Sequence, residues 1–165
     1  MSDRSLLPIE RTLALLAATP ARFAELTAGL TPAQLRAAPS PGEWSANEVL
    51  AHVRACADVR GEPIYQIIAE DHPTFRAVNP LTWIKQTNYL DLDFASSLRA
   101  FAAQRAGLLA ALEPLKPEGW ERAATVAGAG APLTRTVHFY AQWVARHERP
   151  HVKQIASIAA TLRGA

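Results

Sequence analysis

The sequence predicts an all-α fold, a bundle of four principal helices. Ala- and Leu-rich stretches with few β-branched runs favour helix over sheet. Apolar residues recur at helical spacing in four segments, and stretches containing Pro or Gly separate these segments. With 165 residues, of which 49% are apolar and 19% charged, the chain has the size and composition of one domain with its own core. We therefore expect a single domain over residues 1–165.

The first helix is predicted over residues 6–30. Thr19 followed by Pro20 resembles an N-cap with proline at the first helical position, so we expect this helix to be broken or kinked there. Residues 31–42 contain several prolines and end in a Pro-Gly pair. This composition predicts a connector with one short helical turn.

The second helix is predicted over residues 45–69. Ser45 and Glu48 have the spacing of a capping box, in which each side chain accepts a hydrogen bond from the other residue's backbone N–H. Trp44 precedes the cap and is placed to pack on Val49 as a hydrophobic staple. These signals locate the start of the helix.

A long connection with one helical turn over residues 80–88 is predicted to follow, within residues 70–90. Its apolar pattern lapses around two prolines, while several large aromatic residues remain. Asp91 or Asp93 can cap the third helix, which is expected to end before Pro114.

Residues 114–133 are predicted to be a loop, because they contain prolines and the Ala/Gly run 127–131. Thr134 is expected to open the last helix, which runs to about Leu162. Pro150 lies inside this helix and is expected to bend it, since an interior proline removes one backbone hydrogen bond.

Charge and cysteine content exclude several classes of protein. The net charge is +2, and the arginines are scattered along the chain, so no basic patch indicates a nucleic-acid partner. The single cysteine, Cys56, excludes an intramolecular disulfide and a Cys-based structural zinc site. No apolar run approaches the roughly 20 residues of a membrane span. We expect a cytoplasmic protein without a membrane partner.

Three of the histidines are placed to form a metal site. His147 and His151 are four residues apart, so on a helix both project from the same face and can reach one ion. His52 lies on the apolar stripe of the second helix, so all three side chains are expected to point into the bundle. Three neutral imidazoles without a metal would leave several polar nitrogens to satisfy. Three protein ligands would also leave a coordination position open, as in catalytic sites.

The alternative for each of these residues is structural. A histidine on an apolar stripe is often a core residue hydrogen-bonded to a backbone carbonyl. His138 is out of phase with His147, and His72 lies in a predicted loop, so both are expected at the surface or beside the site. Cys56 is expected to be a buried thiol rather than a ligand. Glu48 could orient His52 or act as a base, although its capping role already explains it. The sequence assigns no catalytic residue.

Two segments resemble the DinB/YfiT-like superfamily. They run from Pro41 to Val53 (PGEWSANEVLAHV) and from Ala145 to Ile155 (ARHERPHVKQI). The resemblance implies a four-helix bundle in up-down-down-up order, with a long connection between helices 2 and 3. It also implies a divalent metal held by the histidine triad, which carries over as His52, His147 and His151, and often dimerisation. A homodimer is therefore a possible state of this chain.

The leading functional hypothesis is a divalent-metal-dependent enzyme acting on a small molecule. The metal either lowers the pKa of a bound water for hydrolysis or binds a low-molecular-weight bacterial thiol as thiolate for S-transfer; the family resemblance implies both activities. Zinc is the first expectation, and nickel, iron or manganese also suit imidazole ligands. The alternative is a non-catalytic bundle that binds a metal or a small ligand. A DNA-repair partner, suggested by the family's name, has no support from a basic face.

Further residues could form part of a substrate pocket. Two arginines, Arg60 and Arg146, could hold a substrate carboxylate, with a solvated surface position favoured for both. Aromatic residues could line the pocket, although core packing is the commoner role at their spacing; they are Trp83, Tyr89, Tyr140 and Trp143.

Overall fold

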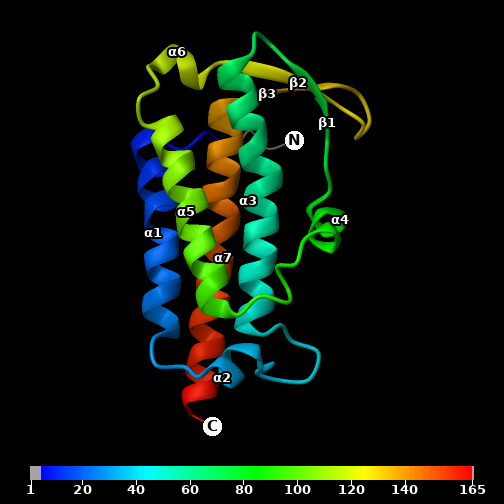
Figure 1. Ribbon diagram of the computed structural model, residues 1–165. Helices are drawn as coiled ribbons and strands as arrows, with labels where there is room; N and C mark the ends of the chain where they lie inside the picture. The colour runs from blue at the N-terminus through cyan, green and yellow to red at the C-terminus, as the bar shows by residue number, and fades with distance from the viewer. Residues whose placement is uncertain (1–4, 165) are drawn as a thin grey trace.

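The structure is a computed structural model that describes residues 5–164 and contains four long helices packed side by side (Figure 1). The four-helix prediction is confirmed. The long helices are α1 (Ile9–Thr27), α3 (Ala46–Ala69), α5 (Phe94–Leu112) and α7 (Val137–Arg163). Helix α7 packs against α1 and α3, and α5 packs against the same two helices. None of the described helices is long and apolar enough to cross a bilayer.

Short helical turns occupy the connections between the long helices. The turn expected within residues 31–42 is α2 (Pro32–Arg36), and the turn expected within residues 80–88 is α4 (Pro80–Trp83) followed by the 3-10 turn η1 (Ile84–Gln86). Another turn, α6 (Pro117–Trp120), follows α5.

A three-stranded sheet corrects the expectation of a purely helical chain. It consists of β1 (Thr74–Arg76), β2 (Ala123–Ala127) and β3 (Leu133–Thr136) in the order β1-β2-β3. Strand β1 pairs in parallel with β2, and β2 pairs antiparallel with β3. The prediction of a loop over 114–133 is therefore wrong, because β2 forms there by pairing with the distant strand β1.

The last helix begins later than expected for the same reason. Thr134 is paired with Thr125 in the sheet and does not open the helix. Thr136 is the N-cap instead, and its Oγ1 accepts a hydrogen bond of 3.0 Å from the backbone N–H of Phe139. Pro150 lies inside the continuous helix α7.

The caps predicted for the second and third helices are confirmed. Glu48 Oε2 accepts a hydrogen bond of 2.7 Å from the backbone N–H of Ser45, and Ser45 Oγ accepts one from the backbone N–H of Glu48. Asp93 caps α5 by accepting a hydrogen bond of 2.9 Å from the backbone N–H of Ser96. Trp44 is 41% exposed, and its ring lies beside His52.

Helix α1 continues through Pro20, where a break or kink was expected. Proline has no N–H to donate to the carbonyl four residues earlier, which belongs to Leu16. The Arg105 guanidinium donates to that carbonyl instead, at 2.7 Å. A residue from α5 thus satisfies the acceptor that proline leaves without its helical partner.

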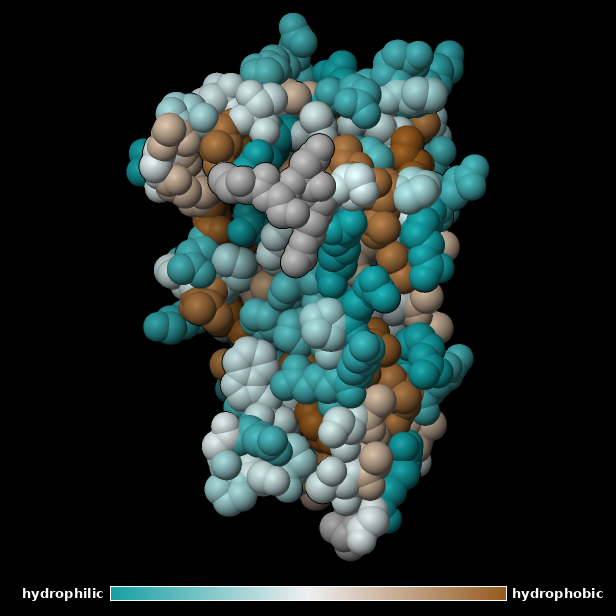
Figure 2. All heavy atoms as spheres, turned by 180° about the vertical axis from the view of Figure 1, so that it is seen from behind, coloured by the Kyte–Doolittle hydropathy of each residue, from teal (hydrophilic) through white to brown (hydrophobic). Residues whose placement is uncertain are grey.

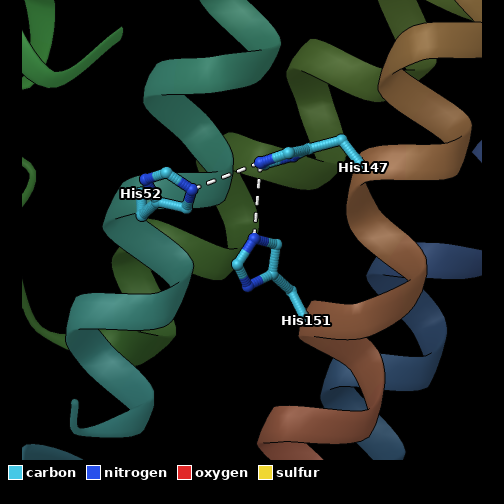
Figure 3. A group of neighbouring side chains, drawn as sticks. All are labelled: His52, His147 and His151. Carbon is cyan, nitrogen blue, oxygen red and sulfur yellow. Dashed lines mark hydrogen bonds between the residues drawn. The ribbon is translucent and has the colours of Figure 1, made fainter. Parts of the chain in front are cut away.

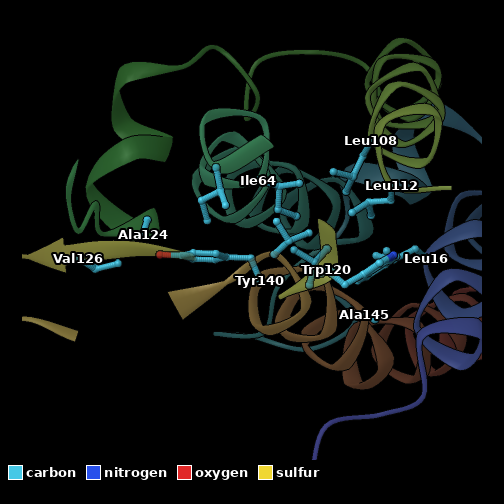
Figure 4. Close-up of a cluster of buried hydrophobic side chains, with 13 residues drawn as sticks. Leu16, Ile64, Leu108, Leu112, Trp120, Ala124, Val126, Tyr140 and Ala145 are labelled. Carbon is cyan, nitrogen blue, oxygen red and sulfur yellow. The ribbon is translucent and has the colours of Figure 1, made fainter. Parts of the chain in front are cut away.

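The core has two apolar clusters with a polar layer between them. One cluster includes Leu16, Trp120 and Tyr140 and lies next to the sheet (Figure 4). The other includes Phe23 and Phe101 at the opposite end of the bundle. On α5 and α7, the residues that separate the two clusters include the buried ion pair Arg105–Glu148. On the face shown in Figure 2, hydrophobic side chains lie scattered among hydrophilic ones.

Candidate metal centre

Three histidines from two helices meet at the contact between α3 and α7 (Figure 3). The Nε2 atom of His147 lies 3.2 Å from Nε2 of His52 and 3.4 Å from Nε2 of His151. One ligand atom of each residue lies within 4.8 Å of the others, which is the spacing that one metal ion requires. The structure therefore brings together the three residues that the sequence singled out.

The helices place these side chains at a flank of the bundle rather than in its core. His147 and His151 lie one turn apart on α7, and His52 faces them from α3. All three are half-buried, whereas the neighbouring Val53 and Glu148 are buried. The expectation that they point into the bundle interior is therefore corrected: the imidazoles lie between two helices and remain reachable from solvent.

Gln154 orients one of the imidazoles. Nδ1 of His151 lies 2.9 Å from Oε1 of Gln154, which can only accept a hydrogen bond. A neutral His151 therefore carries its proton on Nδ1 and keeps the lone pair of Nε2 directed at the cluster. This is the arrangement by which an outer residue sets the tautomer of a metal ligand.

Two tryptophans pack on the other imidazoles. The Trp143 ring is stacked on His147, with ring centroids 4.7 Å apart and an interplanar angle of 11°. The Trp44 ring is tilted against His52 at 5.2 Å. The four-residue spacing of Trp143 and His147 was present in the sequence and could have predicted the stacking. Both rings restrict the imidazoles to the orientations in which their Nε2 atoms converge.

Burial keeps two of the imidazoles neutral. Desolvation, followed by the charges of His151, His52 and Arg60, lowers the pKa of His147 from 6.5 to about 4. Desolvation and the neighbouring His151 also lower the pKa of His52. At neutral pH these rings are in the unprotonated form that metal binding requires.

Cys56 and Glu48 lie near the cluster and have other roles. Cys56 Sγ is 3.6 Å from His52 Nε2, and burial raises the pKa of this thiol to about 12, so it stays protonated. It is the buried thiol that the sequence predicted. Glu48 Oε2 accepts hydrogen bonds from both the backbone N–H and the hydroxyl of Ser45, so its capping role is the one observed.

The remaining histidines lie away from the cluster. His138 is buried rather than at the surface, and its Nε2 donates to the Leu7 carbonyl at 2.7 Å. His72 is exposed, has a positive φ of 43°, and contacts the Thr125 hydroxyl at 3.1 Å.

The two arginines differ from the solvated surface residues that were expected. Arg60 is half-buried, with its guanidinium 4.7 Å from the Trp143 ring centroid. Arg146 is also half-buried, and its guanidinium donates to the Ser5 carbonyl.

A cavity of about 460 Å³ opens beside His151. Its walls come from α7 and from the segment before α3, and they include Trp44, Gln154, Ser157 and the carboxylate of Glu43. Sequence reasoning missed Glu43, because only the tertiary structure places its segment beside α7. Of the three clustered histidines, His151 lines this cavity.

Fold and site together define a class of protein, a four-helix bundle with three histidines converging from two of its helices. This chain belongs to the DinB superfamily, whose sequence profile matches residues 15–155. The family resemblance seen in the sequence is thereby confirmed.

The chain is similar in fold to a solved structure of YfiT from Bacillus subtilis, described as "a probable metal-dependent hydrolase with an unusual four-helix bundle topology". The TM-score is 0.78 at 16% sequence identity, and the match covers 97% of this chain and 91% of YfiT. Comparison with curated protein sequences found no match.

Proposed function

We propose that this protein is a metal-dependent hydrolase whose divalent ion is held by His52, His147 and His151. The observation that carries the proposal is the convergence of one ligand nitrogen from each of three histidines within 4.8 Å of one another, from two helices. The description of YfiT as a probable metal-dependent hydrolase supports the same reaction class for this chain.

The residues fit a divalent ion. Burial lowers the pKa of His52 and of His147, which favours the unprotonated rings that bind metal, and the Gln154 amide oxygen sets the neutral tautomer of His151 in which Nε2 keeps its lone pair. A divalent ion on three neutral ligands has an open coordination position and supplies an activated water at neutral pH. Zinc is the first candidate, followed by nickel, iron and manganese, because imidazole suits all of them.

The chain's own residues would bind and orient a small-molecule substrate. The cavity beside His151 supplies the route, and Trp44 and Trp143 restrict the rings of His52 and His147. Glu43 is the carboxylate in the wall of this cavity, so it is the residue to test as a proton acceptor in place of Glu48.

Thiol transfer is the second candidate, because the same open position could bind a thiolate. Hydrolysis and transfer are distinguished by product. Zinc-loaded protein is assayed with aryl ester and amide substrates, and separately with an alkylating substrate plus a low-molecular-weight thiol. We expect hydrolysis that His147→Ala abolishes. Activity only in the presence of thiol would support the transferase instead, and neither activity would leave a metal-binding module.

Metal content is the first test of the site. Elemental mass spectrometry of tag-free protein reconstituted with zinc is expected to show about one ion per chain, and His52→Ala, His147→Ala and His151→Ala are each expected to lose it. His72→Ala is the matched control, since His72 is exposed and lies away from the cluster. The metal assignment is wrong if the wild type binds none of the four candidate metals, or if the control loses metal as well.

The expected up-down-down-up helix order and the homodimer also belong to this proposal. The order is supported by contacts at both ends of α1: the Leu7 carbonyl meets His138 near the start of α7, and the Leu26 carbonyl meets Arg163 at its end. Light scattering on purified protein would test the dimer.

A further inference from the structure

A second cavity, of about 550 Å³, lies against the outward face of α3. Its far wall is the connection that carries β1 and α4, which runs beside α3 in Figure 1. None of the three clustered histidines lines it, so it is separate from the cavity beside His151. Its walls include the aromatic rings of Phe75, Trp83, Tyr89 and Tyr140. Flat aromatic walls of this kind suit an aromatic or similarly apolar ligand.

Asp58 lines this cavity and accepts hydrogen bonds through both of its carboxylate oxygens. Its Oδ2 accepts hydrogen bonds from Trp83 Nε1 at 3.0 Å and from the Tyr89 hydroxyl at 2.6 Å. Its Oδ1 accepts a hydrogen bond from Gln104. The carboxylate therefore ties the connection to α3 and α5, and both of its oxygens already have donors from the protein.

Arg60 is the half-buried cation of this cavity. Neither ion pair of residues 5–164 includes it, and its Nε is buried without a hydrogen-bond partner. Its guanidinium lies over the Trp143 ring, which orients it without offsetting its charge. Besides Asp58, two other charged residues line the cavity, Glu62 and Arg76, and both are exposed. A half-buried guanidinium outside both of these ion pairs favours an anion, and its planar fork matches a carboxylate.

We propose that this cavity is a binding site for a small aromatic carboxylic acid, with Arg60 binding the carboxylate and the aromatic walls enclosing the ring. The site needs no metal, so it stands or falls independently of the proposed hydrolase. Arg60 lies over the Trp143 ring, and Trp143 stacks on His147. These two side chains therefore connect the proposed acid site to the histidine cluster.

The test compares 2-naphthoate with its uncharged analogue 2-naphthamide. Both are titrated into protein treated with EDTA, so that the acid has no metal to bind. Ligand-detected NMR measures the binding. We expect the acid to bind about tenfold or more tightly than the amide, and Arg60→Gln to remove that difference while Arg60→Lys keeps part of it. Arg146→Gln is the matched control, because Arg146 does not line this cavity. Equal binding of acid and amide, or unchanged acid binding by Arg60→Gln, overturns the proposal.

Gly61 tests where the ligand sits. It lines the cavity, and a Cβ added there meets no atom within 4 Å, so substitutions extend into open space. Gly61→Leu is expected to weaken both ligands about tenfold by filling the cavity, and Gly61→Ala to weaken them much less. Binding that survives Gly61→Leu in folded protein, as judged by circular dichroism, places the ligand elsewhere and overturns the proposal.

Discussion

Two polar groups lie on the same turn of α7 and differ in how their hydrogen-bonding capacity is met. Glu148 is 1% exposed, and both of its oxygens accept from the Arg105 guanidinium, which is 3% exposed. The adjacent His147 is half-buried, and its Nε2 faces two other imidazole nitrogens. The ion pair is complete within the protein, whereas the histidine cluster brings ligand nitrogens of three imidazoles within 4.8 Å of one another.

This difference separates stability from binding. Arg105 also donates to the Leu16 carbonyl, so the ion pair joins α1, α5 and α7. The histidines join only α3 and α7, at a flank that a cavity opens to solvent. We therefore expect changes at the ion pair to alter the free energy of unfolding, and changes at the histidines to alter metal binding.

The largest expected effect follows loss of Arg105. Arg105→Met leaves a buried carboxylate without its partner and is expected to lower the free energy of unfolding by about 3–5 kcal/mol. His151→Ala in metal-free protein is expected to lower it by about 1 kcal/mol or less, because its side chain is half-buried. Urea denaturation measures both. Similar losses in the two variants would contradict the distinction between the regions.

The double variant Arg105→Met/Glu148→Leu is the control for that experiment. It removes both charges and is expected to regain much of the lost stability, because replacing both partners of a buried pair with apolar residues is often close to neutral. A double variant no more stable than Arg105→Met would mean that packing, rather than the unpaired charge, causes the loss.

Gln154 tests the histidine region without removing a ligand. Gln154→Leu removes the acceptor that sets the tautomer of His151 and is expected to weaken zinc binding about 10- to 100-fold. Isothermal titration calorimetry measures the affinity. Lys153→Leu is the control, since Lys153 is exposed on the same helix. Unchanged zinc affinity in Gln154→Leu would show that the hydrogen bond does not orient His151.

Acid is expected to destabilise the metal-free protein through His147. Its pKa is about 4 in the folded protein and 6.5 as the ordinary value, so the unfolded state binds more protons between these values and stability falls as the pH is lowered through them. The loss is about 1–2 kcal/mol after allowance for solvent screening. Urea denaturation at pH 7 and pH 4 measures it, and the decrease should be smaller in His147→Ala. An identical decrease in that variant would assign it to other groups.

The smallest expected effect couples the two proposed sites. Arg60 lies close enough to lower the pKa of His147, and its charge would equally oppose a divalent ion there. A carboxylate bound to Arg60 offsets that charge, so a saturating concentration of 2-naphthoate is expected to raise zinc affinity about twofold. Arg60→Gln should abolish the increase. Zinc affinity that falls with 2-naphthoate would indicate competition for the metal instead of coupling.

The helices and caps could be predicted because their causes are local. The capping box of Ser45 and Glu48 and the cap at Asp93 depend on residues three positions apart, and both are observed. The sheet could not be predicted in this way, because Thr74 pairs with Thr125 and the whole of α5 lies between these two residues in the sequence. Pro20 was misjudged for the same reason, since Arg105, the donor that replaces its missing N–H, comes from another helix.

The sequence by itself determined the helical class, the family and the three candidate ligands, because helical periodicity and the four-residue spacing of His147 and His151 are properties of short segments. Only the tertiary structure decided that His52 faces them across the α3–α7 contact, that Gln154 sets a tautomer, and that Arg60 belongs to neither ion pair of residues 5–164. These features depend on distances between side chains from separate elements. Packing sets such distances, and packing is the sum of many contacts that no local pattern records.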